Sequence, residues 1–203
     1  MNVPLWRDES AEALDEASAL LDDAAVPPAG QGARVRALAG PVFEVMVHGA
    51  PAPQGSKSAM RNESTGRIQL VESSRFVKPW REDVVAACLR ARKRGWQPLT
   101  GPLAAEMVFT LTRPRSHFGT GRNRNLVRPS APALPMGVPD LSKLARSTED
   151  ALTTAGVYRD DALLVEYRGL SKRYHTDHGR VPDVMDVSGC VIRLWALDEE
   201  AGR

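Results

Sequence analysis

Carboxylates flank a short segment that has the spacing of an amphipathic helix. Asp140 begins the segment 140–155, and Asp160 and Asp161 follow its end. Carboxylate oxygens are the ligands that hard cations such as Mg²⁺ prefer. Each acid also has a structural explanation, because Asp140 suits an N-cap and the Asp pair suits a turn. A helix of about 16 residues is roughly 24 Å long, so its two ends come together only if the following strand runs back along it or if the sheet gathers the two ends.

The surrounding elements alternate between strands and helices. In 140–155 the apolar residues follow the i, i+3, i+4 rhythm of one buried face, and Gly156 suits the position after the helix. A second helix is predicted at 78–94. Strands are predicted at 42–49, 67–71, 103–112, 162–174 and 188–197. Two segments rich in Pro and Gly are predicted to lack regular structure, 50–66 and 113–139. We expect an α+β fold in which helices pack on a mixed sheet.

Charge is distributed unevenly along the 203 residues. Residues 1–30 carry seven acids and one base, a net of −6, so the remainder carries +8 of the overall +2. We interpret 1–40 as an acidic, flexible tail and 41–203 as the folded domain. A basic domain favours a polyanionic partner, although a charge of this size also serves solubility alone.

The sequence does not predict a membrane protein. No apolar run approaches the roughly 20 residues that span a bilayer, and the acidic start lacks the basic and apolar regions of a signal peptide. Cys88 and Cys190 are far apart and form no Cys-x-x-Cys. We interpret them as buried thiols and expect a cytoplasmic protein without a disulfide framework or a zinc site.

The segment 139–167 resembles the core motif of the RusA family of Holliday junction resolvases. That motif has an Asp-x-Asp-Asn/Lys-Leu-x-Lys segment opening a helix, an internal Asp-Ala-Leu, a Gly after the helix and an Asp-Asp pair before a strand. The matching segments are DLSKLAR (140–146), DAL (150–152), RDD (159–161), GAPAPQGSKSA (49–59) and RPRSH (113–117). The resemblance extends from about residue 41 to 196 and implies a RusA-like domain.

The resemblance also implies an activity. In that family the motif aspartates hold Mg²⁺, and two copies of the site in a homodimer cut opposed strands of a four-way junction. Asp140 and Asp161 are the implied metal ligands, with Asp160 beside them and with Mn²⁺ able to replace Mg²⁺. A divalent cation stabilises the charge that builds up on an attacked phosphate and lowers the pKa of water. The implied enzyme is a magnesium-dependent endodeoxyribonuclease of DNA recombination and repair.

Two positions depart from the family motif. Ser142 stands where the second motif aspartate is expected, which removes one negative charge from the implied metal site. Arg146 replaces the motif lysine and can still bind a phosphate, but it is a poor proton donor because its pKa exceeds about 12. Glu149 or Glu166 could compensate for Ser142. Alternatively, Glu149 could simply pair with Arg146, three positions earlier.

Basic residues in the loops are candidate DNA contacts. The segment 113–139 holds five arginines and no acid, which is typical of an arm that orders on a polyanion or of an exposed loop. The candidate contacts are Lys57, Arg61, Arg113, Arg115, Lys143 and Lys172. Phosphate contacts position a protein without reading base sequence, which suits recognition of branched DNA.

Three functions agree with these patterns. The first is a junction-resolving nuclease in which Asp140, Asp161 and Arg146 are catalytic. The second, favoured by Ser142, is a weakened relative that binds junctions and cuts them poorly. The third is a non-enzymatic DNA-binding adaptor whose acidic tail recruits another protein.

Overall fold

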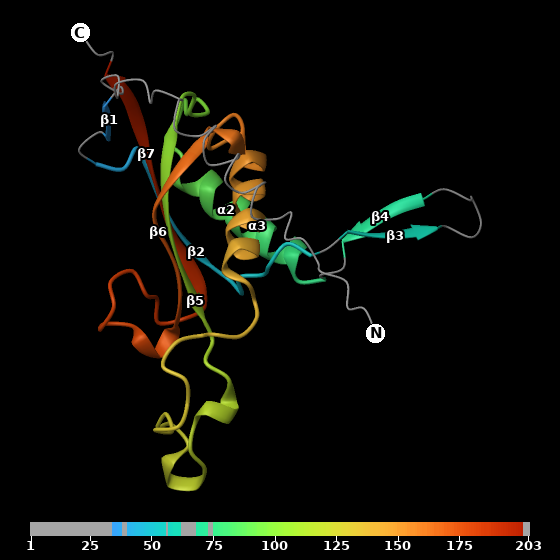
Figure 1. The fold of residues 1–203 in the computed structure, drawn as a ribbon, viewed down its shortest axis with the longest axis vertical. Coiled ribbons are helices and arrows are strands. Elements are labelled where there is room, and N and C mark those ends of the chain that lie inside the picture. Colours follow the sequence, from blue (N-terminus) through green and yellow to red (C-terminus); the bar gives the residue numbers. More distant parts are fainter. Residues whose placement is uncertain (1–33, 38–39, 56, 62–67, 73–74, 201–203) are drawn as a thin grey trace, which may run out of the picture. The chain divides into compact units, whose positions relative to one another are not determined.

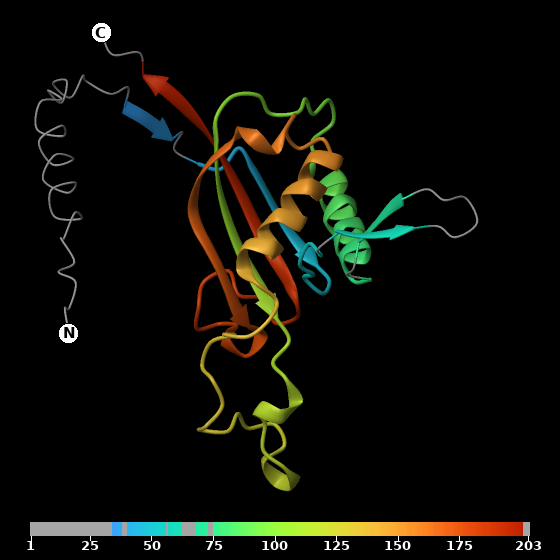
Figure 2. The ribbon, with the colours of Figure 1, turned by 45° about the vertical axis from the view of Figure 1, so that its right-hand side comes forward.

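A mixed β-sheet carries two helices on one of its faces (Figures 1 and 2). The computed structural model describes residues 34–37, 40–55, 57–61, 68–72 and 75–200. Most of the predicted acidic tail therefore lies outside the described residues. Residues 35–198 form one compact unit, and the α+β class expected from the sequence is confirmed.

The sheet, as far as the chain is described, has five strands in the order β1–β7–β5–β6, with β2 also paired to β7. They are β1 (Arg34–Ala37), β2 (Phe43–His48), β5 (Leu103–Leu111), β6 (Leu164–Tyr174) and β7 (Gly189–Glu200). Both β2 and β5 run antiparallel to β7, whereas β6 runs parallel to β5. A parallel pair needs a long crossover, and here the crossover contains the loop 112–140 and the helix that follows it, residues 141–154.

The two helices are α2 (Val77–Ala91) and α3 (Leu141–Thr154). Each buries one apolar face, because its apolar residues recur at helical spacing. The buried residues include Trp80, Val84 and Cys88 of α2, Leu144, Ala151 and Leu152 of α3, and Val45, Val47, Met107, Phe109 and Ile192 of the sheet. Trp80 Nε1 donates to Thr148 Oγ1 at 3.1 Å and so links the two helices inside this core.

Most of the predicted elements are confirmed to within a few residues at their ends. Helix α3 corresponds to the helix predicted at 140–155. It begins directly after Asp140, which occupies the N-cap position. Gly156 follows it with a φ of +62°, a backbone conformation that favours glycine. The prediction for 50–66 was wrong in part, because β3 (Lys57–Arg61) pairs there with β4 (Ile68–Glu72) in an antiparallel hairpin. Strand β1 lies within the range assigned to the tail.

The prediction that the two cysteines are buried thiols is confirmed. Cys88 and Cys190 are free and buried, and burial raises the pKa of the Cys88 thiol to about 12, with Arg92 opposing the rise. Neither described helix, α2 or α3, is long and apolar enough to span a membrane.

A network of ion pairs on β7 gives a stability prediction. Arg193 donates to Glu44 at 2.8 Å, to Glu106 at 3.0 Å and to both carboxylate oxygens of Asp183, at 2.6 and 2.8 Å. These bonds hold the pKa of Asp183 below its ordinary value. Asp183→Asn should lower the free energy of unfolding at pH 7 by about 1–2 kcal/mol, because it removes a charge-assisted hydrogen bond.

Asparagine also tolerates the positive φ of +62° at this position, so the substitution isolates the charge. The contribution of Asp183 exists above its unfolded pKa of about 4 and is lost as pH falls through the lower folded pKa. Urea denaturation should therefore separate the two proteins at pH 7, and the difference should shrink as the pH falls below about 4. Equal stability at pH 7 would contradict this account.

Candidate active site

An open pocket of about 500 Å³ lies between α3 and the start of β6. Helix α3 contributes Ser142, Arg146 and Glu149 to its wall, and Asp161 enters from the short 3₁₀ helix η3 (Asp161–Leu163). The other lining residues are Ala145, Ala162, Leu164, Tyr167 and Leu170. The pocket therefore combines two carboxylates, a hydroxyl and a guanidinium on a partly apolar floor.

The path of β6 explains how the pocket forms. Asp161, just before β6, shares the pocket with Glu149 in the second half of α3. Near the other end of β6, Lys172 Nζ donates to the carbonyls of Gly137 and Pro139, just before α3, at 2.6 and 2.8 Å. The strand thus runs back along the helix, which places Asp161 beside the second half of α3 and Lys172 beside its start, and Figure 2 shows the two elements together.

Asp140 and Asp160 make local contacts. The Asp140 carboxylate forms an ion pair with Lys143 Nζ, with 3.0 Å between oxygen and nitrogen, and Asp140 is not among the residues that line the pocket. Along the helix axis, Asp140 lies roughly 14 Å from the level of Glu149. The Asp160 carboxylate accepts from the backbone N–H of Ala162 at 2.9 Å. The metal roles predicted for Asp140, Asp160 and Asp161 stay predictions.

The described residues contain no group of three or more His, Cys, Asp or Glu side chains placed to hold a metal ion. The carboxylates that do face each other are Glu149 and Asp161. Burial first, and then the charges of Asp161 and Asp150, raise the pKa of Glu149, while Arg146 lowers it in part. Asp150 itself is ion-paired with Arg81 of α2. Glu149 and Asp161 thus form an electrostatically unfavourable pair.

We expect the repulsion between Glu149 and Asp161 to lower the free energy of unfolding. Glu149→Gln should raise the free energy of unfolding by roughly 1 kcal/mol at pH 7 in a chelating buffer, because it removes a half-buried charge that faces Asp161. For a chain of this length that corresponds to about 2–4 °C in Tm. The folded pKa of Glu149 is raised, so the wild type loses stability as pH rises through it, and the gain should grow from pH 4 upwards. Thermal melts across this range would test the sign, and a destabilised variant at pH 7 would contradict it.

Three predicted DNA contacts also make contacts within the protein. Arg113 is only 5% exposed, its Nε donates to Thr176 Oγ1 at 2.9 Å, and its guanidinium stacks 4.0 Å from the Tyr174 ring centre. Its Nη1 donates to the carbonyl of Pro132 at 2.8 Å, so Arg113 holds the long loop against the end of β6. Lys143 and Lys172 are engaged as described above.

Other cations of the long loop remain on the surface. Arg115 is exposed and donates to the carbonyl of Arg124 at 2.9 Å. Arg122, Arg124 and Arg128 are also exposed, and no acid lies within 113–139. Lys57 and Arg61 belong to β3, and their side chains lie outside the described part. The exposed arginines of this loop are therefore the best-supported candidates for contacts with DNA.

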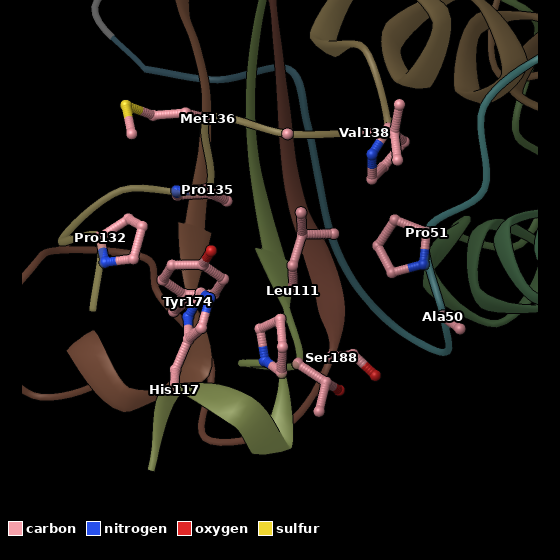
Figure 3. Close-up of a pocket in the computed structure, with 14 residues that line it drawn as sticks. Ala50, Pro51, Leu111, His117, Pro132, Pro135, Met136, Val138, Tyr174 and Ser188 are labelled. Atoms are coloured by element: carbon pink, nitrogen blue, oxygen red, sulfur yellow. The ribbon is translucent and has the colours of Figure 1, made fainter. Parts of the chain in front are cut away.

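A second pocket of about 500 Å³ lies between this loop and the ends of β5 and β6 (Figure 3). Tyr174 and His117 form one side and Pro51 the opposite side, and Met136 and Val138 come from the loop. Asp, Glu, Lys and Arg are all absent from its lining residues. This pocket therefore lacks the carboxylates that a hard cation prefers. The pocket lined by Ser142, Arg146, Glu149 and Asp161, called the carboxylate pocket below, is the candidate active site.

The sequence did not predict how the loop 49–55 supports α3. Ser147 Oγ donates to the carbonyl of Ala52 at 2.6 Å, and the Gln54 N–H donates to the carbonyl of Lys143 at 2.9 Å. Ser147 is fully buried. A serine within a helix does not reveal in the sequence that it makes such a contact. By contrast, Glu149 lies seven residues after Ser142, and this spacing could have indicated that the two residues share one face of the helix.

Comparison with known proteins identifies the family. A family model described as endodeoxyribonuclease RusA matches residues 48–182, which include α3, η3, β6 and every residue of the carboxylate pocket. A comparison with curated proteins gave no match. Because the family match extends over well over half of the 203 residues, the chain belongs to the RusA endodeoxyribonuclease family.

Proposed function

We propose that this chain is a magnesium-dependent endodeoxyribonuclease that resolves four-way DNA junctions by paired nicks during recombination and repair. Membership of the RusA family supports a junction-resolving endonuclease in general. The observation that carries the finer proposal is the pocket shared by Asp161, Glu149, Ser142 and Arg146. It offers oxygen ligands and a cationic side chain at one open surface.

The donor set suits the proposed cation. Carboxylate and hydroxyl oxygens are hard ligands that fit Mg²⁺, or Mn²⁺ in its place. The pocket is open to solvent, so water and a phosphate have access. Asp161 is the proposed principal ligand, and Asp140 and Asp160 are proposed beside it from the family motif. When bound, the cation would stabilise the charge that builds up on the phosphate and favour ionisation of the attacking water.

The side chains of the pocket then have separate roles. The exposed Arg146 presents a guanidinium that can bind two phosphate oxygens and position the backbone. Hydrolysis adds water across one P–O bond: the hydroxide joins phosphorus and a proton goes to the leaving oxygen. Because Arg146 stays charged at any ordinary pH, that proton comes from solvent. Ser142 can donate a hydrogen bond to a phosphate oxygen or to water.

Paired nicks require two active sites, and the pocket lined by Asp161 and Glu149 would supply one site per chain. We therefore propose a homodimer on branched DNA, with the exposed arginines of 113–139 contacting phosphates. Phosphate contacts would select the shape of the junction rather than its sequence. The free, buried cysteines suit the reducing conditions of the cytoplasm, where we place the protein.

A weakened, junction-binding relative is the second candidate. Ser142 and Arg146, the two departures from the family motif, both line the pocket, so they act where the chemistry would take place. Incubating the purified chain with a labelled four-way junction, with Mg²⁺, Mn²⁺ or a chelator, separates the candidates. Symmetric nicks that need metal support the nuclease, binding without nicks supports the weakened relative, and neither binding nor nicks would reject both.

A further inference from the structure

Ser142 leaves the candidate site short of one carboxylate. It occupies the second residue of α3 and lines the pocket that also holds Asp161. A hydroxyl is a neutral ligand, so it does not balance a divalent cation as a second carboxylate would. A second carboxylate for the cation would therefore have to come from another acid that lines the same pocket.

Glu149 is that acid. It lies seven residues after Ser142 on α3, a spacing that returns to nearly the same helix face about 10 Å further along. Both side chains line the pocket, together with Asp161. Glu166, the other acid near this region in sequence, is exposed on β6 and does not line it.

Glu149 lines the pocket, and its carboxylate forms no ion pair within the described residues. Of the ion pairs recorded for the described residues of α3, one joins Lys143 to Asp140 and another joins Arg81 to Asp150. The charge of Arg146 lowers the pKa of Glu149 in part, but among the described residues the two side chains form no ion pair. The backbone at Glu149 is fixed, because its carbonyl accepts from Tyr158 Oη at 3.1 Å and from Thr153 Oγ1 at 3.2 Å.

The electrostatics agree with a ligand role. Glu149 and Asp161 line the same pocket, so their negative charges repel each other. Such a pair is unfavourable for a structure without a cation, and a divalent cation between them would turn the repulsion into shared attraction. Sites that disfavour the empty fold in this way are typical of functional positions.

We propose that Glu149 supplies the second carboxylate for the divalent cation held by Asp161, in place of the aspartate that Ser142 replaces. The inference rests on the proposed metal-dependent function. In this proposal a residue outside the family motif replaces the missing carboxylate at position 142. The cation would therefore lie further along α3 than the motif positions alone would place it.

Manganese binding to the full chain tests this role without measuring cleavage. Titration calorimetry would compare the wild type with Glu149→Gln, Glu166→Gln, Ser142→Asp and the double variant Ser142→Asp/Glu149→Gln. Glu149→Gln should weaken Mn²⁺ binding at least about tenfold, a loss that even groups supporting a metal site produce. Glu166→Gln should bind within about twofold of the wild type, because it keeps every pocket ligand. The double variant should recover most of the affinity, since it restores the count of carboxylates.

The outcomes are distinguishable. If the wild type binds Mn²⁺ and Glu149→Gln binds it equally well, the role of Glu149 is wrong and the proposed function stands. If the wild type shows no saturable binding, both are wrong. A thermal melt in chelator verifies that Glu149→Gln is folded, and Glu149→Asp, which keeps the charge, provides a second variant. Glu149→Asp should retain more affinity than Glu149→Gln, and the reverse order would also overturn the role.

Discussion

Replacing Asp161 with asparagine should reduce metal-dependent cleavage of a four-way junction by about 10²–10³-fold, a loss of several kcal/mol of transition-state stabilisation. Asp161 is exposed at the start of η3 and faces Glu149, Ser142 and Arg146 across the pocket. Asparagine has nearly the same shape but lacks the charge that holds a divalent cation. Single-turnover cleavage of a labelled junction at saturating protein measures the effect on the chemical step.

Junction binding should change little in this variant. The exposed arginines of 113–139 remain, and removing a negative charge from the pocket cannot weaken the attraction for phosphates. Asp186→Asn is a matched control, because it removes the charge of an exposed aspartate in the loop before β7, outside the carboxylate pocket. It should cut at the wild-type rate. Full cleavage by Asp161→Asn would remove the basis for the metal proposal.

The elements that position the pocket could be predicted from local patterns. Helix α3 has a strong i, i+3, i+4 rhythm, and its end is marked by Gly156, whose φ of +62° only a few residue types adopt readily. Strands β2, β5 and β7 are rich in the branched and aromatic residues that suit a buried sheet. These signals lie within a few residues of each other, so a single sequence carries them.

The arrangement of side chains in the pocket depended on long-range pairing. Strand β6 lies parallel to β5 with two register irregularities, near Ala104 and Glu106, and sequence alone does not set such shifts. Strand β3, which pairs with the predicted strand β4, was missed because Gly, Pro and Ser in its neighbourhood indicated a loop, while cross-strand pairing determines the structure. Arg113 was interpreted as a DNA contact because charge alone does not reveal burial.

The same limit applies to the carboxylates. Motif reasoning joined Asp140 with Asp161, since both belong to the family pattern. In the structure the pocket joins Asp161 with Glu149, and Asp140 binds Lys143 at the start of the helix. Which acids face each other depends on how far β6 runs back along α3, and that distance follows from the packing of both elements on the core.

Restoring an aspartate at position 142 should strengthen the site. Ser142→Asp adds a carboxylate to the pocket wall that already presents Asp161. It should shift the Mg²⁺ concentration for half-maximal cleavage downwards by about tenfold, because each added carboxylate increases the affinity for a hard divalent cation. The position is exposed in the first turn of α3, where the helix dipole favours a negative charge, so the fold should tolerate the change.

Ser142→Asn separates charge from shape in this experiment. It places a side chain of nearly the same size in the pocket without adding a negative charge, so its Mg²⁺ titration should follow that of the wild type. Identical titrations for Ser142→Asp and Ser142→Asn would mean that the missing carboxylate does not limit the enzyme. If Glu149 already fills that role, the gain from Ser142→Asp should be larger in the Glu149→Gln background than in the wild type, because two residues that serve one cation are not additive. Equal gains in both backgrounds would show that residues 142 and 149 act on the cation independently.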